Sequence, residues 1–383
     1  MEAYLDNSAT TRVSEDVKNI VVKTMTEDYG NPSSRHQKGV DAEKYVREAR
    51  ERIAATLKVD EREIYFTSGG TESNNWALIG GALANRRAGN HIITTAVEHA
   101  AVLQPLTFLQ DMGFSISYLP VDSCGHVKLD ALKEQLDQDT ILVSAMYVNN
   151  EVGAVEPIEE IGKIVKGYNP DILFHVDAIQ AYGKYRIYPR KLGTDMLSVS
   201  GHKIHGPKGS GFLYIREKAK VKPLIYGGGQ QRGMRSGTDN VPGCAGLGVA
   251  AMEAYTNFDE KVASMRACKK RLIDGLNQIE GAYVVSRLED APQIVSCAFP
   301  GVRSEVLLHA LEEKGVYVSS GSACSSNRKV PVSSVLQEIH LKPEMQDSTI
   351  RFSFCDWTTP EEIDYALKCL NELVPVLKRY MRR

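Results

Sequence analysis

The chain has 383 residues, and it contains no long apolar segment and no excess of either charge. No apolar run approaches the roughly 20 residues that a helix needs to cross a bilayer, so we expect no membrane span and no membrane partner. The first residues, Met-Glu-Ala-Tyr-Leu-Asp, lack the basic start and apolar core of a secretory signal, so we expect no signal peptide. These absences favour a cytoplasmic protein.

Charge and cysteine usage exclude further classes of protein. The 46 Lys+Arg and 48 Asp+Glu residues give a formal charge of −2, so no electrostatic argument favours direct binding to nucleic acid. The seven cysteines are odd in number, and no two of them have Cys-x-x-Cys spacing. A zinc ribbon or a dithiol redox site is therefore not expected, and the pattern fits a reducing compartment.

The length of the chain and a change of pattern along it predict two domains. Single cores stop growing near roughly 250–300 residues, and this chain is longer. Residues 14–257, in which apolar strands alternate with helices, are expected to form a large domain. Residues 1–13 and 258–383 are expected to form a smaller α+β domain, with 1–13 as an extended arm.

The alternation in the first part predicts an α/β fold. We expect a mostly parallel sheet of seven strands, covered by helices on both faces. The expected strands are 64–67, 91–95, 115–119, 141–148, 172–176, 196–200 and 211–215. The last follows its predecessor so closely that antiparallel pairing is expected there. In the second part we expect a long helix over 261–279 and strands near 282–286, 294–299, 316–319 and 350–354.

Small or polar residues directly follow five of the predicted strands. Because ligands bind beyond the carboxyl ends of the strands in an open parallel sheet, we expect these residues to surround one site. They are Gly70, Thr71, His99, Asn150, Asp177, Ser200, Gly201, His202 and Lys203.

Lys203 is the centre of this prediction. The strand 196–200 is followed by a loop of small and cationic residues, which would present the lysine in a pocket. An amine held among hydroxyl, imidazole and backbone N–H groups suits imine formation with an aldehyde cofactor. The alternative is a solvated surface lysine, the ordinary state of this residue type.

The other positions also have a functional and a structural interpretation. Gly70 and Thr71 open a helix, where backbone N–H groups favour a phosphate, or they form a plain N-terminal cap. Asp177 ends an apolar strand, so its carboxylate needs a buried partner, either a pyridinium N–H or the backbone. His99 could stack on an aromatic ring or be a structural residue. Asn150 could donate to an anionic oxygen or be a turn residue.

A second group of candidates lies near the end of the chain. The segment 319–329 lacks bulky apolar residues and is expected to be exposed and mobile. Cys324 within it is a candidate nucleophile whose thiolate Arg328 and Lys329 would favour; the alternative is an incidental surface thiol. Arg351 could bind a substrate carboxylate through two hydrogen bonds or form a structural ion pair.

Three other patterns carry less weight. Gly201 and Gly206 have the spacing of a phosphate-binding P-loop, but Pro207 occupies the position of its lysine. Residues 246–251 match a dinucleotide fingerprint loosely, but no strand precedes them, so close helix packing explains them better. His202 and His205 have no acidic or cysteine neighbours spaced to complete a metal site, so we expect no metal.

Several short stretches, spread over nearly the whole chain, are typical of one family. They are residues 4–11, 30–34, 67–73, 98–99, 148–153, 175–180, 200–203, 232–238 and 320–324. In combination they resemble the NifS/IscS-like cysteine desulfurases, class-V aminotransferase-like proteins of fold type I that depend on pyridoxal 5′-phosphate. The resemblance implies this fold and this cofactor for the chain.

The resemblance implies roles for the residues around the cofactor ring. Lys203 would bond to the cofactor aldehyde, Asp177 would pair with the pyridine nitrogen, and Gln180 would pair with the ring hydroxyl. His99 would stack on the ring and take part in catalysis. The phosphate would be held by Gly70, Thr71, Ser200, His202 and, from the other subunit of a homodimer, Thr238.

The resemblance also implies how the substrate is bound and converted. Asn150, beside the cofactor, and Arg351 would orient the carboxylate of L-cysteine, and Cys324 would take the sulfur as a persulfide while L-alanine leaves. A sulfur-acceptor protein would then use it for iron–sulfur cluster assembly or for thiolation of tRNA or cofactors. A selenocysteine lyase, a small-substrate aminotransferase and a non-catalytic partner protein are the alternatives with the same fold.

Overall fold

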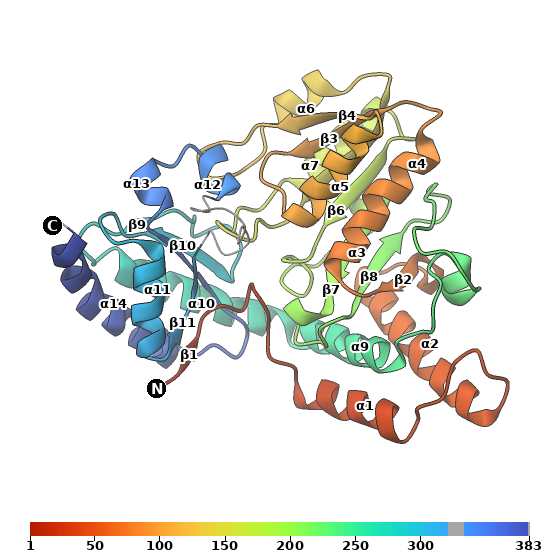
Figure 1. Ribbon diagram of the computed structural model, residues 1–383, viewed down its shortest axis with the longest axis horizontal. Coiled ribbons are helices and arrows are strands. Elements are labelled where there is room, and N and C mark those ends of the chain that lie inside the picture. Colours follow the sequence, from red (N-terminus) through yellow and green to blue (C-terminus); the bar gives the residue numbers. More distant parts are fainter. Residues whose placement is uncertain (321–332, 382–383) are drawn as a thin grey trace.

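The computed structural model describes residues 1–320 and 333–381. In this part of the chain a seven-stranded sheet has the order β2-β8-β7-β6-β5-β3-β4 (Figure 1). Its pairing is parallel except that β8 runs antiparallel to both neighbours, β2 and β7. The strands are β2 (Ile64–Thr67), β3 (His91–Thr95), β4 (Ser115–Leu119), β5 (Thr140–Met146), β6 (Leu173–Asp177), β7 (Met196–Ser200) and β8 (Gly211–Ile215). The predicted α/β sheet is confirmed, including its antiparallel last strand.

Alternate residues of the central strands belong to two separate apolar cores. In β5, Val143 packs in the core on one face and Leu142 in the core on the other. In β7, Leu197 and Met196 divide in the same way. Because side chains of a strand point alternately to the two faces, continuous apolar runs indicate a sheet that helices cover on both sides.

The helices come from both the alternating part of the chain and its C-terminal part. One face of the central sheet is covered by α1 (Glu15–Thr26), α2 (Gln37–Leu57), α7 (Ile158–Tyr168) and α9 (Val241–Tyr255), and the other by α4 (Gly81–Asn85) and α5 (Ala100–Asp111). The remaining α-helices are α3 (Gly70–Asn75), α6 (Leu129–Gln135), α8 (Pro189–Leu192), α10 (Phe258–Leu276), α11 (Ser304–Glu313), α12 (Ser334–Glu338), α13 (Pro343–Gln346) and α14 (Pro360–Met381). No helix of the described ranges is long and apolar enough to cross a membrane.

A second unit with its own core lies beside the central sheet, at the left of Figure 1. Its antiparallel sheet has the order β12-β13-β10-β9, and α10, α11 and α14 contribute to the core. The N-terminal strand β1 (Ala3–Tyr4) pairs with β11 (Val316–Tyr317) of this unit. The other strands are β9 (Tyr283–Val284), β10 (Ile294–Ala298), β12 (Ser319–Ser320) and β13 (Thr349–Ser353). The N-terminal arm therefore joins the second unit before the chain enters α1.

Two expectations for the second part of the chain are corrected. The single strand expected over 316–319 is two short strands, because β11 pairs with β1 whereas β12 pairs with β13. The helix expected over 261–279 spans Phe258–Leu276 instead, and it follows Asn257, which has a left-handed backbone with φ of 53°. The first difference depends on strand partners far away in the sequence, and the second coincides with a local change of the backbone.

Candidate active site

Most of the predicted site residues surround one cavity of about 380 Å³ at the carboxyl ends of the central strands. Cys324 lies outside the described residues, but Ser319 and Ser320 line the cavity. Thr238 is exposed and is not part of the lining. The predicted residues that do line it are Gly70, Thr71, His99, Asn150, Asp177, Gln180, Ser200, His202, Lys203 and Arg351.

Asp177, the last residue of β6, has a buried side chain. The side-chain amide of Asn74 donates a hydrogen bond of 2.7 Å to its Oδ2, and the backbone N–H of Ile179 donates one of 3.0 Å to Oδ1. Burial raises the pKa of the Asp177 carboxyl, and the two hydrogen bonds oppose this rise because they stabilise the carboxylate. A cationic partner in the cavity would stabilise the ionised form further.

Lys203 ends the helical turn η3 (Gly201–Lys203), which directly follows β7. Its Nζ donates to the backbone carbonyls of Ser8 and Ala9, the second at 2.7 Å. The N-terminal arm thus reaches the lysine. On the other side, Lys184 Nζ donates to the carbonyl of Lys203 at 2.6 Å. A half-buried lysine with these contacts is not a solvated surface lysine.

Two glycines are required where β2 leads into α3, one for lack of space and one for its backbone conformation. A Cβ atom at Gly70 would lie 2.1 Å from Cδ1 of Ile179, and Gly69 has φ of 147°, which favours glycine. At the same end of the cavity, His202 Nδ1 is 3.2 Å from Thr10 Oγ1. Burial, aided by the charge of Lys203, lowers the pKa of His202 to about 4, so its ring is neutral at pH 7. An anion here would meet hydroxyl, imidazole and backbone N–H groups.

His99 has a structural role as well as a place in the cavity. Its Nδ1 accepts a hydrogen bond of 3.0 Å from the backbone N–H of Ala101, which caps α5. Burial lowers the pKa of the imidazole, so the ring is neutral and Nε2 carries the proton. The structural interpretation of His99 therefore holds here, together with its exposure to the cavity.

Arg351 of β13 forms the ion pair that was the alternative to substrate binding. Its Nη2 lies 2.9 Å from Oδ1 of Asp6, and its Nη1 donates to the backbone carbonyl of Asn150 at 2.9 Å. The buried Nε has no partner among the described residues. One edge of the guanidinium is occupied, and a donor remains for another oxygen.

A family model for aminotransferase class-V matches residues 3–366. The chain belongs to the class-V aminotransferase family. A protein of Methanosarcina thermophila named cysteine desulfurase IscS is 43% identical over 376 residues, 98% of this chain and 92% of that protein. A relative of the same name from Dictyoglomus turgidum is 43% identical over 98% of this chain and 95% of that protein.

Solved structures of the family agree with these sequence relatives. A NifS-like protein has a TM-score of 0.93 at 41% identity, with 98% of this chain and 100% of that chain covered. SspA in complex with cysteine has a TM-score of 0.80 at 33% identity, covering 93% and 100% of the two chains. The chain thus groups with the cysteine desulfurases of the family, and the resemblance and the type I fold are confirmed.

The sequence argument missed several residues of this class-V aminotransferase that line the cavity or hold a lining residue in place. Asn74 was overlooked, although it follows Gly70 by one helical turn and so lies on the same face of α3. Asp6, Ser8 and Ala9 lie in the stretch 4–11, which carried the resemblance without any role. Glu151 also lines the cavity, and burial raises the pKa of its carboxyl to about 7.

Proposed function

We propose that this protein is a pyridoxal 5′-phosphate-dependent cysteine desulfurase that converts L-cysteine to L-alanine and leaves a persulfide on Cys324. One observation carries the proposal: Lys203, Asp177 and Arg351 line a single cavity that extends to Ser320, close in sequence to Cys324. The relatives named above, among them a structure with cysteine bound, support the same substrate class.

The residues present fit pyridoxal phosphate. Asp177 is a buried carboxylate held by two donors, which suits a protonated pyridine nitrogen. The missing side chain at Gly70 lets the backbone approach a phosphate, and Thr71, Ser200 and His202 line the same end of the cavity. A volume of about 380 Å³ lies in the range of small-molecule sites.

When bound, pyridoxal phosphate supplies an aldehyde for the substrate amine and a ring that withdraws electrons from the α-carbon. The amine of Lys203 then removes the proton from the substrate α-carbon. Asp177 would hold a proton at the ring nitrogen of the bound cofactor, and Asn74 holds that carboxylate in place. Arg351, with Asn150, holds the substrate carboxylate so that the α-carbon stays within reach of Lys203. Gln180 donates to the carbonyl of Ser8 and lies beside the same amine.

Cys324 supplies the second half of the reaction. Its thiolate attacks the sulfur of the substrate, a sulfur–sulfur bond forms as the carbon–sulfur bond breaks, and the electron pair of the broken bond stays with carbon. Protons taken up at that carbon complete alanine. The persulfide remains on the chain for transfer to an acceptor protein, for cluster assembly or for thiolation.

The arrangement of domains, subunits and compartment is also proposed. Separate apolar cores support a division into a large domain of residues 14–257 and a small one of 1–13 and 258–383. A homodimer would bring the exposed Thr238 of one subunit to the phosphate end of the other's cavity. Cysteines without disulfides, among the described residues, support a reducing cytoplasm.

The test is a visible spectrum together with an assay of alanine and sulfide from L-cysteine, with a reductant present. We expect a yellow protein that makes both products in equal amounts. Cys324→Ala should keep the cofactor absorbance and lose alanine production, whereas Cys124→Ala, a change outside the cavity lining, should keep both. Full alanine production by Cys324→Ala would remove Cys324 from the mechanism.

The same assay separates the rival functions. Selenocysteine turnover that survives Cys324→Ala would favour a selenocysteine lyase. Formation of the aminated cofactor together with keto acid products would favour an aminotransferase. A colourless protein that ignores added pyridoxal phosphate would contradict every enzymatic reading.

A further inference from the structure

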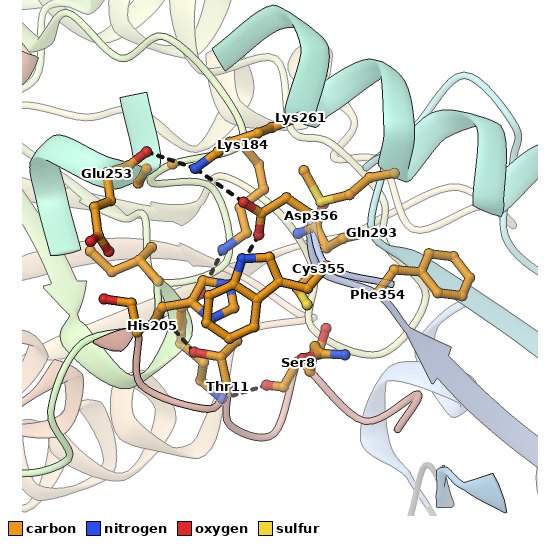
Figure 2. A pocket seen from close by; sticks show the side chains of 18 of the residues that line it. Ser8, Thr11, Lys184, His205, Glu253, Lys261, Gln293, Phe354, Cys355 and Asp356 are labelled. Carbon is orange, nitrogen blue, oxygen red and sulfur yellow. Dashed lines mark hydrogen bonds and ion pairs between the residues drawn. The ribbon is translucent and has the colours of Figure 1, made fainter. Parts of the chain in front are cut away.

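A second cavity, of about 330 Å³, also has Lys203 in its lining, and Figure 2 shows residues that surround it. Both cavities are lined by Ser8, Gln180 and Lys203. The second cavity is bounded by the loop after β7, which carries His205, and by the loop after β13, which carries Cys355 and Asp356. One nitrogen, one sulfur and one carboxylate oxygen of these last three side chains lie within 4.8 Å of one another.

We propose that His205, Cys355 and Asp356 form a zinc site with one open position. Imidazole nitrogen, thiolate and carboxylate oxygen are all zinc ligands, and three protein ligands plus water are the usual set of an open site. Bond lengths of about 2.0–2.3 Å place neighbouring ligand atoms about 3.3–3.6 Å apart in a tetrahedron. His205 Nε2 and Asp356 Oδ1 are already 3.1 Å apart. The sulfur of Cys355 lies within 4.8 Å of both atoms, so a small rearrangement of its side chain would complete the set.

His205 is held in the orientation that a ligand needs. Its Nδ1 is 2.8 Å from the backbone carbonyl of Arg12, to which it donates, so Nε2 is the nitrogen that can bind a metal. The ring packs on Trp357 with centroids 3.9 Å apart. The backbone of His205 has φ of 64°, an uncommon conformation for a residue other than glycine. Such strain is frequent at functional sites.

Asp356 divides its two oxygens between the proposed ion and a lysine. Oδ1 faces His205, whereas Oδ2 is 3.0 Å from Lys261 Nζ, so the ion pair persists when Oδ1 binds zinc. The Cys355 thiol gives up its proton to solvent on binding. Thiolate and carboxylate then cancel the charge of Zn²⁺. The occupied site therefore carries no net charge beside Lys184 and Lys261, which also line this cavity.

The proposed site joins two sheets. His205 follows the central sheet, and Cys355 and Asp356 follow the four-stranded sheet, so a bound ion would cross-link them. His205 and Asp356 are 151 residues apart, which is why neighbouring sequence gave no indication of a metal. Close by, Lys184 donates to the carbonyl of Lys203. The proposed cross-link and Lys203 therefore belong to the lining of the same cavity.

The test measures Zn²⁺ affinity of the purified holoenzyme by competition with a chromophoric chelator. A Cys324→Ser background removes the thiol of the proposed reaction. We expect one equivalent of tightly bound zinc in this background. Adding Cys355→Ser should weaken the affinity at least about 10-fold, because serine keeps the volume but replaces the thiolate. Cys124→Ser, the matched control, should leave the affinity unchanged.

X-ray absorption at the zinc edge gives a second readout. One sulfur and two or three nitrogen or oxygen neighbours are expected in the Cys324→Ser background, and the sulfur should vanish with Cys355→Ser. A first shell without sulfur overturns the proposal even where Cys355→Ser does not fold. An affinity unaffected by Cys355→Ser, or no retained zinc in the presence of the chelator, overturns it as well.

Discussion

Asn74 donates a hydrogen bond of 2.7 Å to the buried carboxylate of Asp177. If this carboxylate pairs with the cofactor ring, Asn74→Ala should weaken binding of pyridoxal phosphate about 10- to 100-fold, since a hydrogen bond to a charged group contributes about 1.5–3 kcal/mol. Titration of the apoprotein with the cofactor, followed by absorbance, measures the change. Asn85→Ala is the control, because that amide donates to the carbonyls of Gly81 and Lys220, which are not in the cavity lining. Equal affinities of Asn74→Ala and the parent protein would contradict the pairing.

Arg351 is expected to bind the substrate carboxylate while its ion pair with Asp6 persists. Arg351→Lys should raise KM for L-cysteine about 10- to 100-fold with a smaller change in kcat. The ammonium of lysine lacks the planar geometry that lets the guanidinium bond Asp6 and Asn150 and still offer a donor to the substrate. Steady-state kinetics separates the two constants. Arg303→Lys, an exposed arginine with looser ion pairs, should change neither. A loss confined to kcat would show that Arg351 does not bind the ground-state carboxylate.

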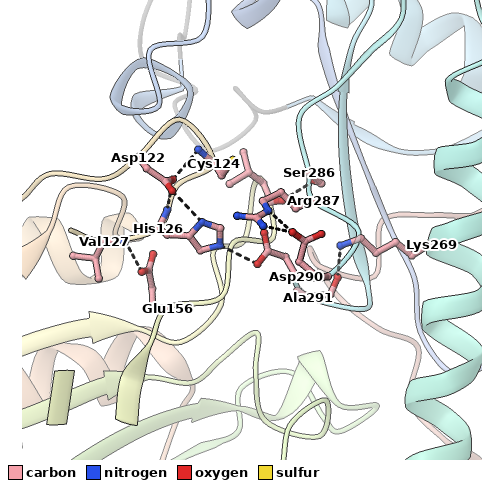
Figure 3. A network of polar contacts seen from close by, with 12 residues as sticks. Asp122, Cys124, His126, Val127, Glu156, Lys269, Ser286, Arg287, Asp290 and Ala291 are labelled. Atoms are coloured by element: carbon pink, nitrogen blue, oxygen red, sulfur yellow. Dashed lines mark hydrogen bonds and ion pairs between the residues drawn. The ribbon is translucent and has the colours of Figure 1, made fainter. Parts of the chain in front are cut away.

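His126 and Asp290 join two loops on opposite sides of the polar network in Figure 3. His126 Nε2 is 2.9 Å from Asp290 Oδ1, and Nδ1 is 3.5 Å from Asp122 Oδ2. The hydrogen bond with Asp290 raises the pKa of His126, against the opposing effect of burial. Because the folded state holds this proton more tightly, its stabilisation is complete below the unfolded pKa of about 6.5 and is lost as pH rises through the folded pKa.

His126→Gln should therefore lower the free energy of unfolding most at about pH 6, by about 1 kcal/mol for this partly buried pair, and least at about pH 8.5. Thermal unfolding of both proteins across this range measures the difference. His309→Gln is the control, since His309 is exposed on α11. A difference independent of pH would mean that the charge of His126 does not contribute.

Gly211 and Gly167 should respond to alanine in opposite directions. A Cβ atom at Gly211 would lie 2.6 Å from the carbonyl oxygen of Val199 and 2.7 Å from Cα of Gly69, both backbone atoms that cannot rotate away. Gly211→Ala should lower the free energy of unfolding by about 1–3 kcal/mol and weaken cofactor binding, because it displaces the turn before Gly70. At Gly167, in α7, nothing lies within 4 Å, so alanine should stabilise by about 0.5–1 kcal/mol. Midpoints of thermal unfolding decide both signs.

The local sequence pattern was sufficient to predict the central sheet and the residues at its edge. Asp177 and Lys203 follow apolar strands that are buried on both faces, and the alternation of these strands with helices allows few arrangements. In a parallel sheet the carboxyl ends meet at one edge, so residues at strand ends converge without any knowledge of their contacts. His99 and Gly70 were located in the same way.

Contacts between distant segments were decided only by the tertiary structure. The ion pair of Asp6 with Arg351 and the cluster of His205, Cys355 and Asp356 join residues that hydrophobic periodicity treats as unrelated. Strand pairing and the docking of the N-terminal arm bring them together, and those depend on the complementarity of whole surfaces rather than on any short window. The sequence alone therefore determined which elements form and which residues end them, and packing decided which side chains meet.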